Sequence, residues 1–489
     1  MHNINLTPQE IDIIDLPNEE LRWSVVKLSE IVERENRLEA SVFDIEGKHA
    51  REVLGRCKWE LTTICGSNGL ATAYHRPRFK RIWVEKSQYP IYQPSQITDI
   101  FPKPYAYISD KTNTDIDGLR VKFGQILLTC SGTIGNTTVV TRTLENKIFS
   151  HDLIRINPYN DLDIGYIYAF LKTKVGNTLV NTNSYGAVIS HIEPEHLATV
   201  PIPNASPIIK AEINRLIMDS FRLRDESNEL LVKAESILVD ELKLPPLEEM
   251  EQERFDKSVE FRNFSVKLSE LDNRLEASYH LPLVKSIIKY LQTNSKEVTT
   301  ISDKRISKKI ILPGRFKRVY VEEGQGTVFF GGKQIFELDP SNKKYLSLKH
   351  HSKRIKDELS LKENMIMVTC SGTIGKTVLV PKHWENWTAN QHIIRIIPAS
   401  EDIAGYLFVF LASDYGYQLI TRFTYGAVVD EIDDVNHISN VQIPLLLNHE
   451  RQLEINSLAL EANRKRFEAY KLEQKAIKIM NEDVIHAEK

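Results

Sequence analysis

Apolar residues follow a strand-like pattern at two places about 240 residues apart in the chain. Gln125 to Thr129 and Asn364 to Thr369 are short runs rich in Ile, Leu, Val and Met, and each leads into Gly-Thr-Ile-Gly. A second apolar run then begins at Thr137 and at Thr377. A strand, a glycine-rich turn and another strand in this order predict a hairpin in each half of the chain.

Another strand and a helix are predicted after each hairpin. Residues 154–156 and 394–396 read Ile-Arg-Ile, and a proline follows two residues later. Residues 164–175 and 403–415 then carry aromatic and aliphatic side chains at helical spacing, and we expect Gly176 and Gly416 to be left-handed C-caps. Each half is therefore expected to be an α+β domain with a strand-rich core.

A longer amphipathic pattern closes each half. Residues 207–243 begin with Ser206-Pro207, a good cap and first-turn pair, and residues 449–486 repeat the stripe with several small residues. Each pattern predicts a helix of about 50–55 Å at 1.5 Å per residue. We expect the two helices to form an antiparallel coiled coil, and the alternative is that each stripe packs on its own domain.

The two halves are copies of one module. The seven residues Thr-Cys-Ser-Gly-Thr-Ile-Gly stand at 129–135 and again at 369–375. The other matched blocks are Val26 to Glu30 with Val266 to Glu270, Asn36 to Ser41 with Asn273 to Ser278, Arg78 to Arg81 with Arg315 to Arg318, and Tyr185 to Val188 with Tyr425 to Val428. A period this long indicates duplicated domains rather than a solenoid. Residues 82–128 and 319–368 share little sequence, as if one frame carried two different faces.

These patterns predict an order of domains and linkers along the chain. The predicted order is an N-terminal extension (1–21), a first domain (22–205), a central long helix (206–246), an acidic linker (247–262), a second domain (263–447) and a C-terminal long helix (448–489). We have no role for the extension beyond an arm or a cap.

Length and composition indicate an ordinary globular protein. The chain has 489 residues, of which 42% are hydrophobic and 26% charged, so it is long enough for several domains with cores. It shows no signal-peptide pattern and no apolar run that would span a bilayer, and we expect a cytoplasmic protein without a membrane partner. Cys57, Cys65, Cys130 and Cys370 have no zinc spacing, so no metal is expected, and the last two are expected to be small apolar residues at strand ends.

Positive charge is clustered although the net charge is only −3. Each module carries a basic run at the same point, and a further cluster spans 349–356. Such runs suit phosphates, because neutralising the DNA backbone releases counterions; a solvated, solubilising face is the alternative. The predicted phosphate-binding residues are Arg76, Arg78, Lys80, Arg81, Lys308, Lys309, Arg315, Lys317 and Arg318.

No catalytic constellation is readable. Asn157-Pro158-Tyr159 lacks a residue of the motif that holds a flipped adenine in amino-methyltransferases, and no glycine-rich loop for a methyl donor precedes it. Asp240-Glu241-Leu242-Lys243 contains the Glu-x-Lys of many nucleases, but it lies within a helical stripe. His151 and Asp152 align with Gln391 and His392, so no pair is retained in both modules. We therefore expect no catalytic residue and no cofactor in this chain.

The whole arrangement resembles the specificity subunit of type I restriction-modification systems. The resemblance covers about residues 20 to 486 and rests on two divergent modules, each with a Ser-Gly-Thr-Ile-Gly turn, a Tyr-Gly-Ala-Val block, a proline-rich strand end and a following long helix. It implies a non-catalytic subunit whose two target-recognition domains each read half of a split site in double-stranded DNA. It also implies docking of two methyltransferase subunits, which would bind S-adenosylmethionine, and in some complexes of restriction or translocase subunits.

Several residue roles remain open. Ser131, Thr133, Ser371 and Thr373 either face DNA or close a barrel corner, and Tyr185 and Tyr425 are either groove contacts or core residues. Base readout is expected in the unmatched stretches, whose divergence predicts an asymmetric site. The target sequence, the spacer length and the modified base are not readable.

Three other functions remain alternatives. The chain could be the specificity subunit of a two-component type II system, a stand-alone DNA nuclease or methyltransferase, or a protein-binding scaffold. Activity of the isolated chain with Mg²⁺ or a methyl donor would favour the enzyme, and lack of DNA affinity in the assembled complex would favour the scaffold.

Overall fold

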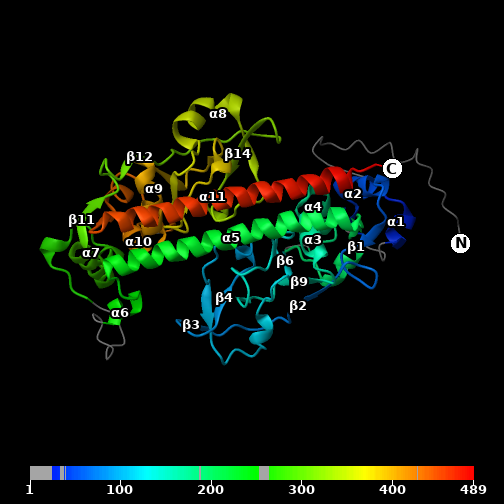
Figure 1. Cartoon of the computed structure of the whole chain (residues 1–489), viewed down its shortest axis with the longest axis horizontal. Helices are drawn as coiled ribbons and strands as arrows, with labels where there is room; N and C mark the ends of the chain where they lie inside the picture. Colours follow the sequence, from blue (N-terminus) through cyan, green and yellow to red (C-terminus); the bar gives the residue numbers. More distant parts are fainter. Residues whose placement is uncertain are drawn as a thin grey trace.

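Two α+β heads lie on opposite sides of a pair of long antiparallel helices in the computed structural model (Figure 1). The structure describes residues 25–33, 38, 40–186, 189–252, 264–426 and 428–488. The predicted N-terminal extension lies outside these residues, and so does the end of the acidic linker. The mixed fold class and the duplication that the sequence predicts are both present.

Within the described residues, the first head contains three small sheets and four α-helices, of which the first is α1 (Leu28–Glu33). Strands β2 (Ala71–His75), β9 (Leu153–Pro158), β6 (Ile126–Thr129) and β7 (Thr137–Val139) form the main sheet in that order. A second sheet has the order β3-β5-β4-β8, and β1 pairs with β10. The bounds of these further elements are β1 Leu61–Thr63, β3 Trp83–Val84, β4 Pro90–Tyr92, β5 Ala106–Ile108, β8 Ile148–Phe149, β10 Pro201–Pro203, α2 Ile45–Arg56, α3 Leu162–Lys172 and α4 Lys174–Asn181. The predicted hairpin is β6 and β7, which pair antiparallel across the glycine-rich turn.

The second head repeats the same three sheets. Its main sheet has the order β12-β19-β16-β17, its second sheet has the order β13-β15-β14-β18, and β11 pairs with β20. The bounds are β11 Ser295–Thr300, β12 Ser307–Ile311, β13 Tyr320–Val321, β14 Gly326–Phe330, β15 Lys344–Ser347, β16 Ile366–Thr369, β17 Thr377–Leu379, β18 Thr388–Ala389, β19 Ile393–Pro398, β20 Gln442–Leu446, α7 Pro282–Asn294, α8 Leu348–Arg354, α9 Glu401–Ala412 and α10 Asp414–Thr421. The second sheets of the two heads have the same strand order although their sequences differ, so the same backbone arrangement carries different side chains in each head.

The expectation that Gly176 and Gly416 are left-handed C-caps is wrong. Both glycines lie inside the short helices α4 and α10, which follow α3 and α9 after a one-residue break. A Cβ at Gly176 would lie 2.1 Å from the carbonyl oxygen of Phe170, and one at Gly416 would lie 2.0 Å from that of Phe410. Glycine is needed here because the backbone of the short helix touches the end of the preceding one.

The long helices are α5 (Pro207–Leu242) and α11 (His449–Ile479). Each begins on its own head and ends in the core of the other head. Ile213 and Phe221 of α5 belong to the first core, whereas Leu238 and Leu242 belong to the second. A turn of π-helix, Met480–Ile485, extends α11 into the core of the first head. The apolar stripes therefore pack both on the heads and on the partner helix.

Small and polar residues form the seam between α5 and α11. Ser220 donates a hydrogen bond to the carbonyl of Ala469 at 2.7 Å, so the two backbones approach closely. Arg224 binds the buried carboxylate of Glu473 at 2.7 Å, and the hydroxyl of Tyr168 donates to the same carboxylate. Burial alone would raise the pKa of Glu473, but Arg224, Lys172 and the hydrogen bond from Tyr168 together outweigh burial, and the net pKa lies below the usual value. The predicted coiled coil thus has a polar seam.

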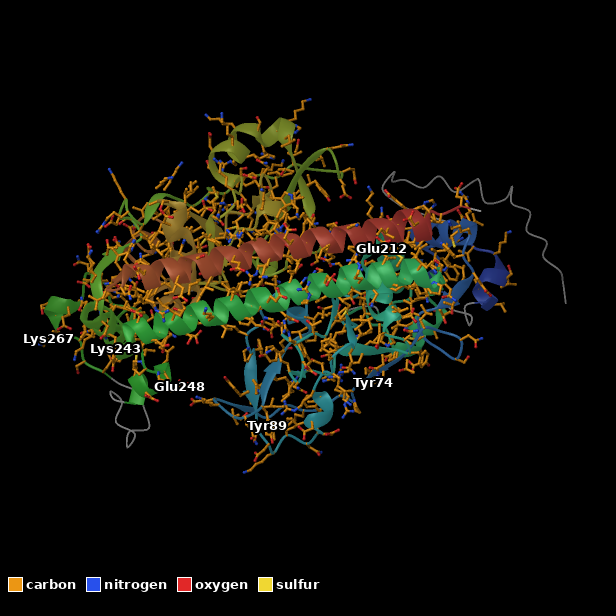
Figure 2. The ribbon with its side chains drawn as sticks, viewed as in Figure 1. Tyr74, Tyr89, Glu212, Lys243, Glu248 and Lys267 are labelled. Carbon is orange, nitrogen blue, oxygen red and sulfur yellow. The ribbon has the colours of Figure 1, made fainter. Side chains whose placement is uncertain are left out.

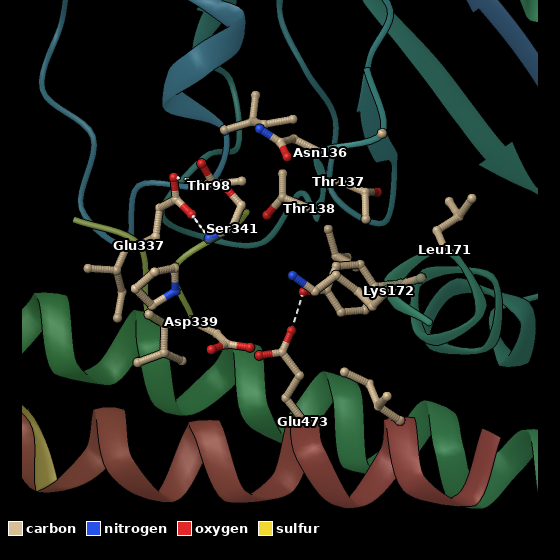
Figure 3. Close-up of a pocket in the computed structure, with 18 of the residues that line it drawn as sticks. Thr98, Asn136, Thr137, Thr138, Leu171, Lys172, Glu337, Asp339, Ser341 and Glu473 are labelled. Atoms are coloured by element: carbon tan, nitrogen blue, oxygen red, sulfur yellow. Dashed lines mark hydrogen bonds between the residues drawn. The ribbon is translucent and has the colours of Figure 1, made fainter. Parts of the chain in front are cut away.

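The heads also touch one another directly. The amide of Ile100 in the first head donates to the carbonyl of Phe336 in the second at 2.8 Å, and Lys103 pairs with Asp414 at 2.8 Å. A cavity of about 630 Å³ lies between the heads and the helix pair (Figure 3). Its lining mixes both charges, with Lys172 facing Asp339 and Glu473. Burial raises the pKa of Asp99, which also lines this cavity, to about 7.

Candidate nucleic-acid interface

The basic run of the first head, Arg76 to Arg81, directly follows β2, which is an edge strand of the main sheet. Two of its cations are held by acids: Arg76 pairs with Asp115 at 2.7 Å and Arg81 with Asp152 at 3.7 Å. Arg78 and Lys80 are exposed and have no acidic partner among the residues that the structure describes. The run therefore presents two free cations flanked by two fixed ones.

The second head repeats this arrangement after β12, again an edge strand. Arg318 donates to the side chain of Gln391 at 2.7 Å and lies over the ring of Phe329 at 5.5 Å. Arg315 is 81% exposed and reaches Glu431 at 3.4 Å, a contact that solvent screens strongly. Lys317 is exposed, and so are Lys308 and Lys309 on the strand itself. Both heads thus offer exposed positive charge beside anchored arginines, which are Arg76 and Arg81 in the first head and Arg318 in the second.

The two Ser-Gly-Thr-Ile-Gly turns contact the residues that follow the Tyr-Gly-Ala-Val blocks. Gly132 donates to the carbonyl of Ser190 at 3.0 Å, and Gly372 donates to that of Asp430 at 3.0 Å. The first glycine of each turn has a positive φ, of 72° and 74°, which favours glycine.

Within these turns the hydroxyl residues have different surroundings. Ser131 and Ser371 are half-buried and form isolated bridges with His191 and Glu431. Thr133 and Thr373 are exposed at the tips, while the isoleucine that follows each threonine is buried. The serines thus take part in closing the loop, and the two threonines stay candidates for contact with a ligand.

Tyr185 and Tyr425 lie at the surface beside these turns, and neither belongs to a core cluster of the described chain. The hydroxyl of Tyr185 donates to Glu193 at 2.6 Å, and this hydrogen bond raises the pKa of the phenol to about 12. Glu193 also pairs with His75 at 2.9 Å. The ring of Tyr425 packs on His437 at 5.1 Å. Both rings are therefore available at the same face as the basic runs.

Three positions that the sequence did not mark as binding residues complete this face. The loops after β8 and β18 supply Asp152 and Gln391, which orient Arg81 and Arg318. Glu431 bridges to Ser371 and Tyr425 and reaches Arg315. In the sequence, His151-Asp152 and Gln391-His392 show only that no catalytic pair is shared by the two modules. The sequence does not show which arginine each loop contacts, so it did not predict this role.

Histidine and arginine are close enough at this face to affect each other. Burial lowers the pKa of His392, and Arg318 and Arg315 lower it further. Burial also lowers the pKa of His151, and Arg81 and Arg78 act in the same direction against Asp152. Positive potential from the basic runs therefore extends over the loops after β8 and β18.

A further basic element occurs in the second head alone among the described segments. Helix α8 carries Lys349, Lys353 and Arg354, and Arg354 donates to the carbonyl of Gly314 at 3.0 Å. It stands out from the helix pair on the outer side of the head (Figure 1). In the first head the same place is taken by the loop that carries Asp115 and Asp117. The two heads thus differ in charge next to otherwise similar basic runs.

The two enzyme-like motifs lie in structural positions. Asn157 sits in β9 opposite Thr72 and accepts a hydrogen bond from Gln125 at 3.0 Å. Glu241 in the last turn of α5 pairs with Arg451 of α11 at 3.3 Å, and Lys243 adopts the left-handed conformation that ends α5. No group of three or more potential metal ligands occurs in the described parts of the chain. No helix there is long and apolar enough to cross a bilayer.

The cysteines are buried, as expected for the two at strand ends. Cys130 and Cys370 follow β6 and β16 directly and are 8% and 3% exposed. Burial raises the pKa of both thiols to about 12. They behave as small apolar residues.

Comparison with known proteins gives matches among solved structures alone. No protein-family model matches the chain, and no curated protein sequence matches it. The chain is similar to the S subunit of a type I restriction-modification system from M. genitalium, with 13% identity, 88% of this chain and 96% of that chain covered, and a TM-score of 0.29.

A similar result comes from the HsdS subunit of Thermoanaerobacter tengcongensis, with 13% identity, 86% and 99% coverage and a TM-score of 0.26. A third match is a chain of a type I R-M system described for its assembly and conformational transition, with 12% identity, 86% and 97% coverage and a TM-score of 0.26. Because the identities and TM-scores are low, the residues of this chain have to carry any functional conclusion.

Proposed function

We propose that this chain is the DNA-specificity subunit of a type I restriction-modification complex. The observation that carries the proposal is the repeated face: each head places a basic run, a glycine-rich turn and an exposed tyrosine together beside the main sheet. The phosphate backbone is the same at both halves of a DNA site, so a repeated basic face is what two backbone contacts need. The unlike side chains of the second sheets then read unlike bases.

The dimensions of the helix pair support this reading. Helix α5 has 36 residues and α11 has 31, which correspond to about 54 Å and 46 Å at 1.5 Å per residue. Two heads that read the same side of a duplex must sit about one helical turn apart, about 34–36 Å. A rod of this length accommodates that spacing, and it leaves its own surface for partner subunits.

The partners and cofactors follow from the function proposed. Double-stranded DNA is the ligand, two methyltransferase subunits would carry S-adenosylmethionine, and restriction or translocase subunits would join in the full complex. This chain supplies recognition and no catalytic group, and the cytoplasm is the place where such a complex would meet DNA. A two-component type II system would use the same faces with a fused nuclease and methyltransferase as its partner.

The test is a map of methylated bases. The chain is co-expressed with the methyltransferase encoded beside it in a host without other methylation, and modified positions are read by single-molecule sequencing. We expect an asymmetric two-part motif that is lost without the chain, and one half of the motif should change when residues 22–205 are replaced by the first domain of another specificity subunit. Methylation that is unchanged without the chain would refute the proposal.

A further inference from the structure

The two heads contact each other through the same loop of each head. The first contact loop spans residues 93–103 after β4, and the second spans residues 331–341 after β14. Gln96 and Gln334 close the two loops in the same way. Each side chain accepts a hydrogen bond from the backbone amide three residues earlier, at 2.9 and 3.1 Å, and donates one to the carbonyl seven residues later. The contact loops therefore keep one shape within stretches that share little other sequence.

The contact loops pair with one another through their backbones. Asp99 and Glu337 form an isolated antiparallel bridge, and the amide of Ile100 donates to the carbonyl of Phe336 at 2.8 Å. Asn228 of α5 donates to the carbonyl of Ile100 at 2.7 Å, so the first loop is also held against the helix pair. The paired loops form part of the wall of the cavity between the heads, which Asp99, Ile100 and Glu337 all line (Figure 3).

A carboxyl group lies at the centre of this contact in both copies. Asp99 follows Gln96 by three residues and Glu337 follows Gln334 by three residues, so the two acids hold matching places. Burial makes an ionised carboxylate costly, and a second carboxylate nearby makes it more costly. Most other positions differ between the two loops, whereas an acid stands at this place in both. An uncharged side chain would pack there at lower cost, so the recurrence of an acid points to a role for its proton.

The surroundings of Asp99 favour its protonated form. Burial raises the pKa of Asp99 to about 7, although Lys376 of the second head opposes this shift, and the neighbouring Glu337 acts in the same direction as burial. Lys376 directly follows the second Ser-Gly-Thr-Ile-Gly turn, and its amide donates to the hydroxyl oxygen of Thr369 at 3.0 Å. The cation that opposes protonation of Asp99 is therefore attached to a turn of the candidate nucleic-acid interface.

Glu337 has neighbours of both signs. Burial raises its pKa and Asp339 acts in the same direction, whereas hydrogen bonds from the amide and hydroxyl of Ser341, at 2.6 and 3.2 Å, and the charge of Lys172 in the first head oppose the shift. Asp339 is itself paired with Lys343. The net shift of the pKa of Glu337 is upward, so both acids bind a proton more tightly in the paired loops than in solvent. The other charged side chains that line the cavity are Glu323, Lys174, Arg224, Asp225 and Glu473.

The contact loops can separate without moving the heads along the helix pair. Helix α5 extends from Glu212 near one end of the molecule to Lys243 near the other, and its two ends are buried in different cores (Figure 2). We propose that Asp99 and Glu337 act as a proton-dependent latch between the heads: the contact loops stay paired while the carboxyls hold their protons, and they separate when the carboxyls ionise. Separation of the loops widens the entrance to the cavity. The inference does not depend on the proposed function.

The test measures how firmly the loops are paired at each pH. Hydrogen-deuterium exchange of the full chain is followed by mass spectrometry between about pH 5 and 8, with rates corrected for the intrinsic effect of pH on exchange. The reporter is the amide of Ile100, which is bonded across the contact. The variants are Asp99→Asn with Glu337→Gln, which keeps the side-chain sizes and removes both titrations, and Lys376→Met. The matched control is Asp414→Asn, because Asp414 also pairs across the heads, with a lysine at 2.8 Å, but is 65% exposed.

The paired state binds protons more tightly than the separated state, so its advantage is complete below about pH 4 and is lost as the pH rises through about 7. In the parent chain, protection of the Ile100 amide should therefore fall by up to about tenfold per pH unit for each carboxyl that ionises on separation. The double variant should stay protected without this fall, and Asp414→Asn should behave like the parent. Lys376→Met should extend the fall to higher pH, because the cation that lowers the pKa of Asp99 is gone.

Three results would each overturn the latch: protection in the parent that does not change with pH, the same fall in the double variant as in the parent, or loss of the fall in Asp414→Asn. Circular dichroism shows whether the double variant is folded, and if it is not, Lys376→Met decides, because an unchanged pH range in that variant would also overturn the latch. DNA and partner subunits take no part in the measurement. Failure of the latch therefore leaves the proposed function intact, and failure of the methylation test leaves the latch intact.

Discussion

The free cations of the two basic runs should contribute to DNA binding through the phosphates alone. Arg78 and Lys80 in the first head, and Arg315 and Lys317 in the second, are exposed and unpaired or weakly paired. Each phosphate contact contributes about 0.9 to the slope of log K against log salt concentration. The pair Arg78→Ala with Lys80→Ala should lower that slope by about 1.8, and the pair Arg315→Ala with Lys317→Ala by about the same amount.

The slope can be turned into a measured ratio. A loss of about 1.8 in slope means that the binding defect of a double variant is about tenfold larger at 50 mM salt than at 200 mM. The assay is fluorescence anisotropy of the assembled complex on a labelled duplex at several salt concentrations, with a target duplex and an unrelated duplex. Because phosphate contacts carry no sequence information, the loss should be equal on both.

A control of equal charge change distinguishes position from net charge. Lys289→Ala with Lys296→Ala removes two exposed lysines of the second head from α7 and β11 and should leave the slope unchanged. An unchanged slope in both test variants, or an equal fall in the control, would refute the assignment of these cations to phosphates.

Three predictions concern stability, measured as the free energy of unfolding in urea. Glu473→Ala should cost about 3–5 kcal/mol, because it leaves Arg224 buried without its partner at 2.7 Å, and adding Arg224→Ala should cost less than the sum of the single changes; additive costs would show that the pair is not coupled. Burial raises the pKa of Asp99 to about 7, so the stability that its protonated carboxyl gives the folded chain is complete below about pH 4 and is lost as the pH rises through 7. Asp99→Asn should therefore raise the free energy of unfolding by about 1–3 kcal/mol at pH 8 and make it depend less on pH between 4 and 7. The same pH dependence in the variant and the parent would contradict this. Alanine is intrinsically better than glycine in a helix by about 1 kcal/mol, but Gly176→Ala should still destabilise by more than about 1 kcal/mol, because its Cβ would lie 2.1 Å from the carbonyl oxygen of Phe170. A Cβ at Gly55 in α2 has nothing within 4 Å, so Gly55→Ala should stabilise by about 0.5–1 kcal/mol. Equal effects of the two changes would mean that the close approach at Gly176 does not matter.

Sequence patterns predicted the repeated elements better than the contacts between them. The hairpins, the long helices and the duplication are readable because each depends on local periodicity or on identity between distant blocks. The second sheets were not readable. Strands β3 and β13 have two residues each, too few for a period of two to appear.

The long helices show what periodicity alone leaves out. The stripe on α5 faces α11 as expected, but it also faces the heads: Ile213 at one end and Leu238 at the other belong to two different cores, and each core also contains residues of α11. A periodic stripe shows that a face is buried but does not show everything that covers it. The seam also uses Ser220, Arg224 and Glu473, which a search for apolar heptads does not find. Likewise, the exposed cations of the basic runs are visible in the sequence from charge alone. Asp152 and Gln391 are not, because their role depends on which arginine they contact in space.

Because each long helix ends in the core of the other head, the helix pair also determines where differences between half-sites can arise. The last turns of α5 are part of the second core, and the end of α11 is part of the first, where Trp59 donates to the carbonyl of Asp483 at 3.0 Å. Moving one head along the rod would therefore disrupt the core of the other, so the separation of the heads is fixed by the frame. The main sheets and basic runs are also alike in both heads. On the proposed function, discrimination between the two half-sites is then left to the side chains of the unmatched segments and to local charge such as that of α8.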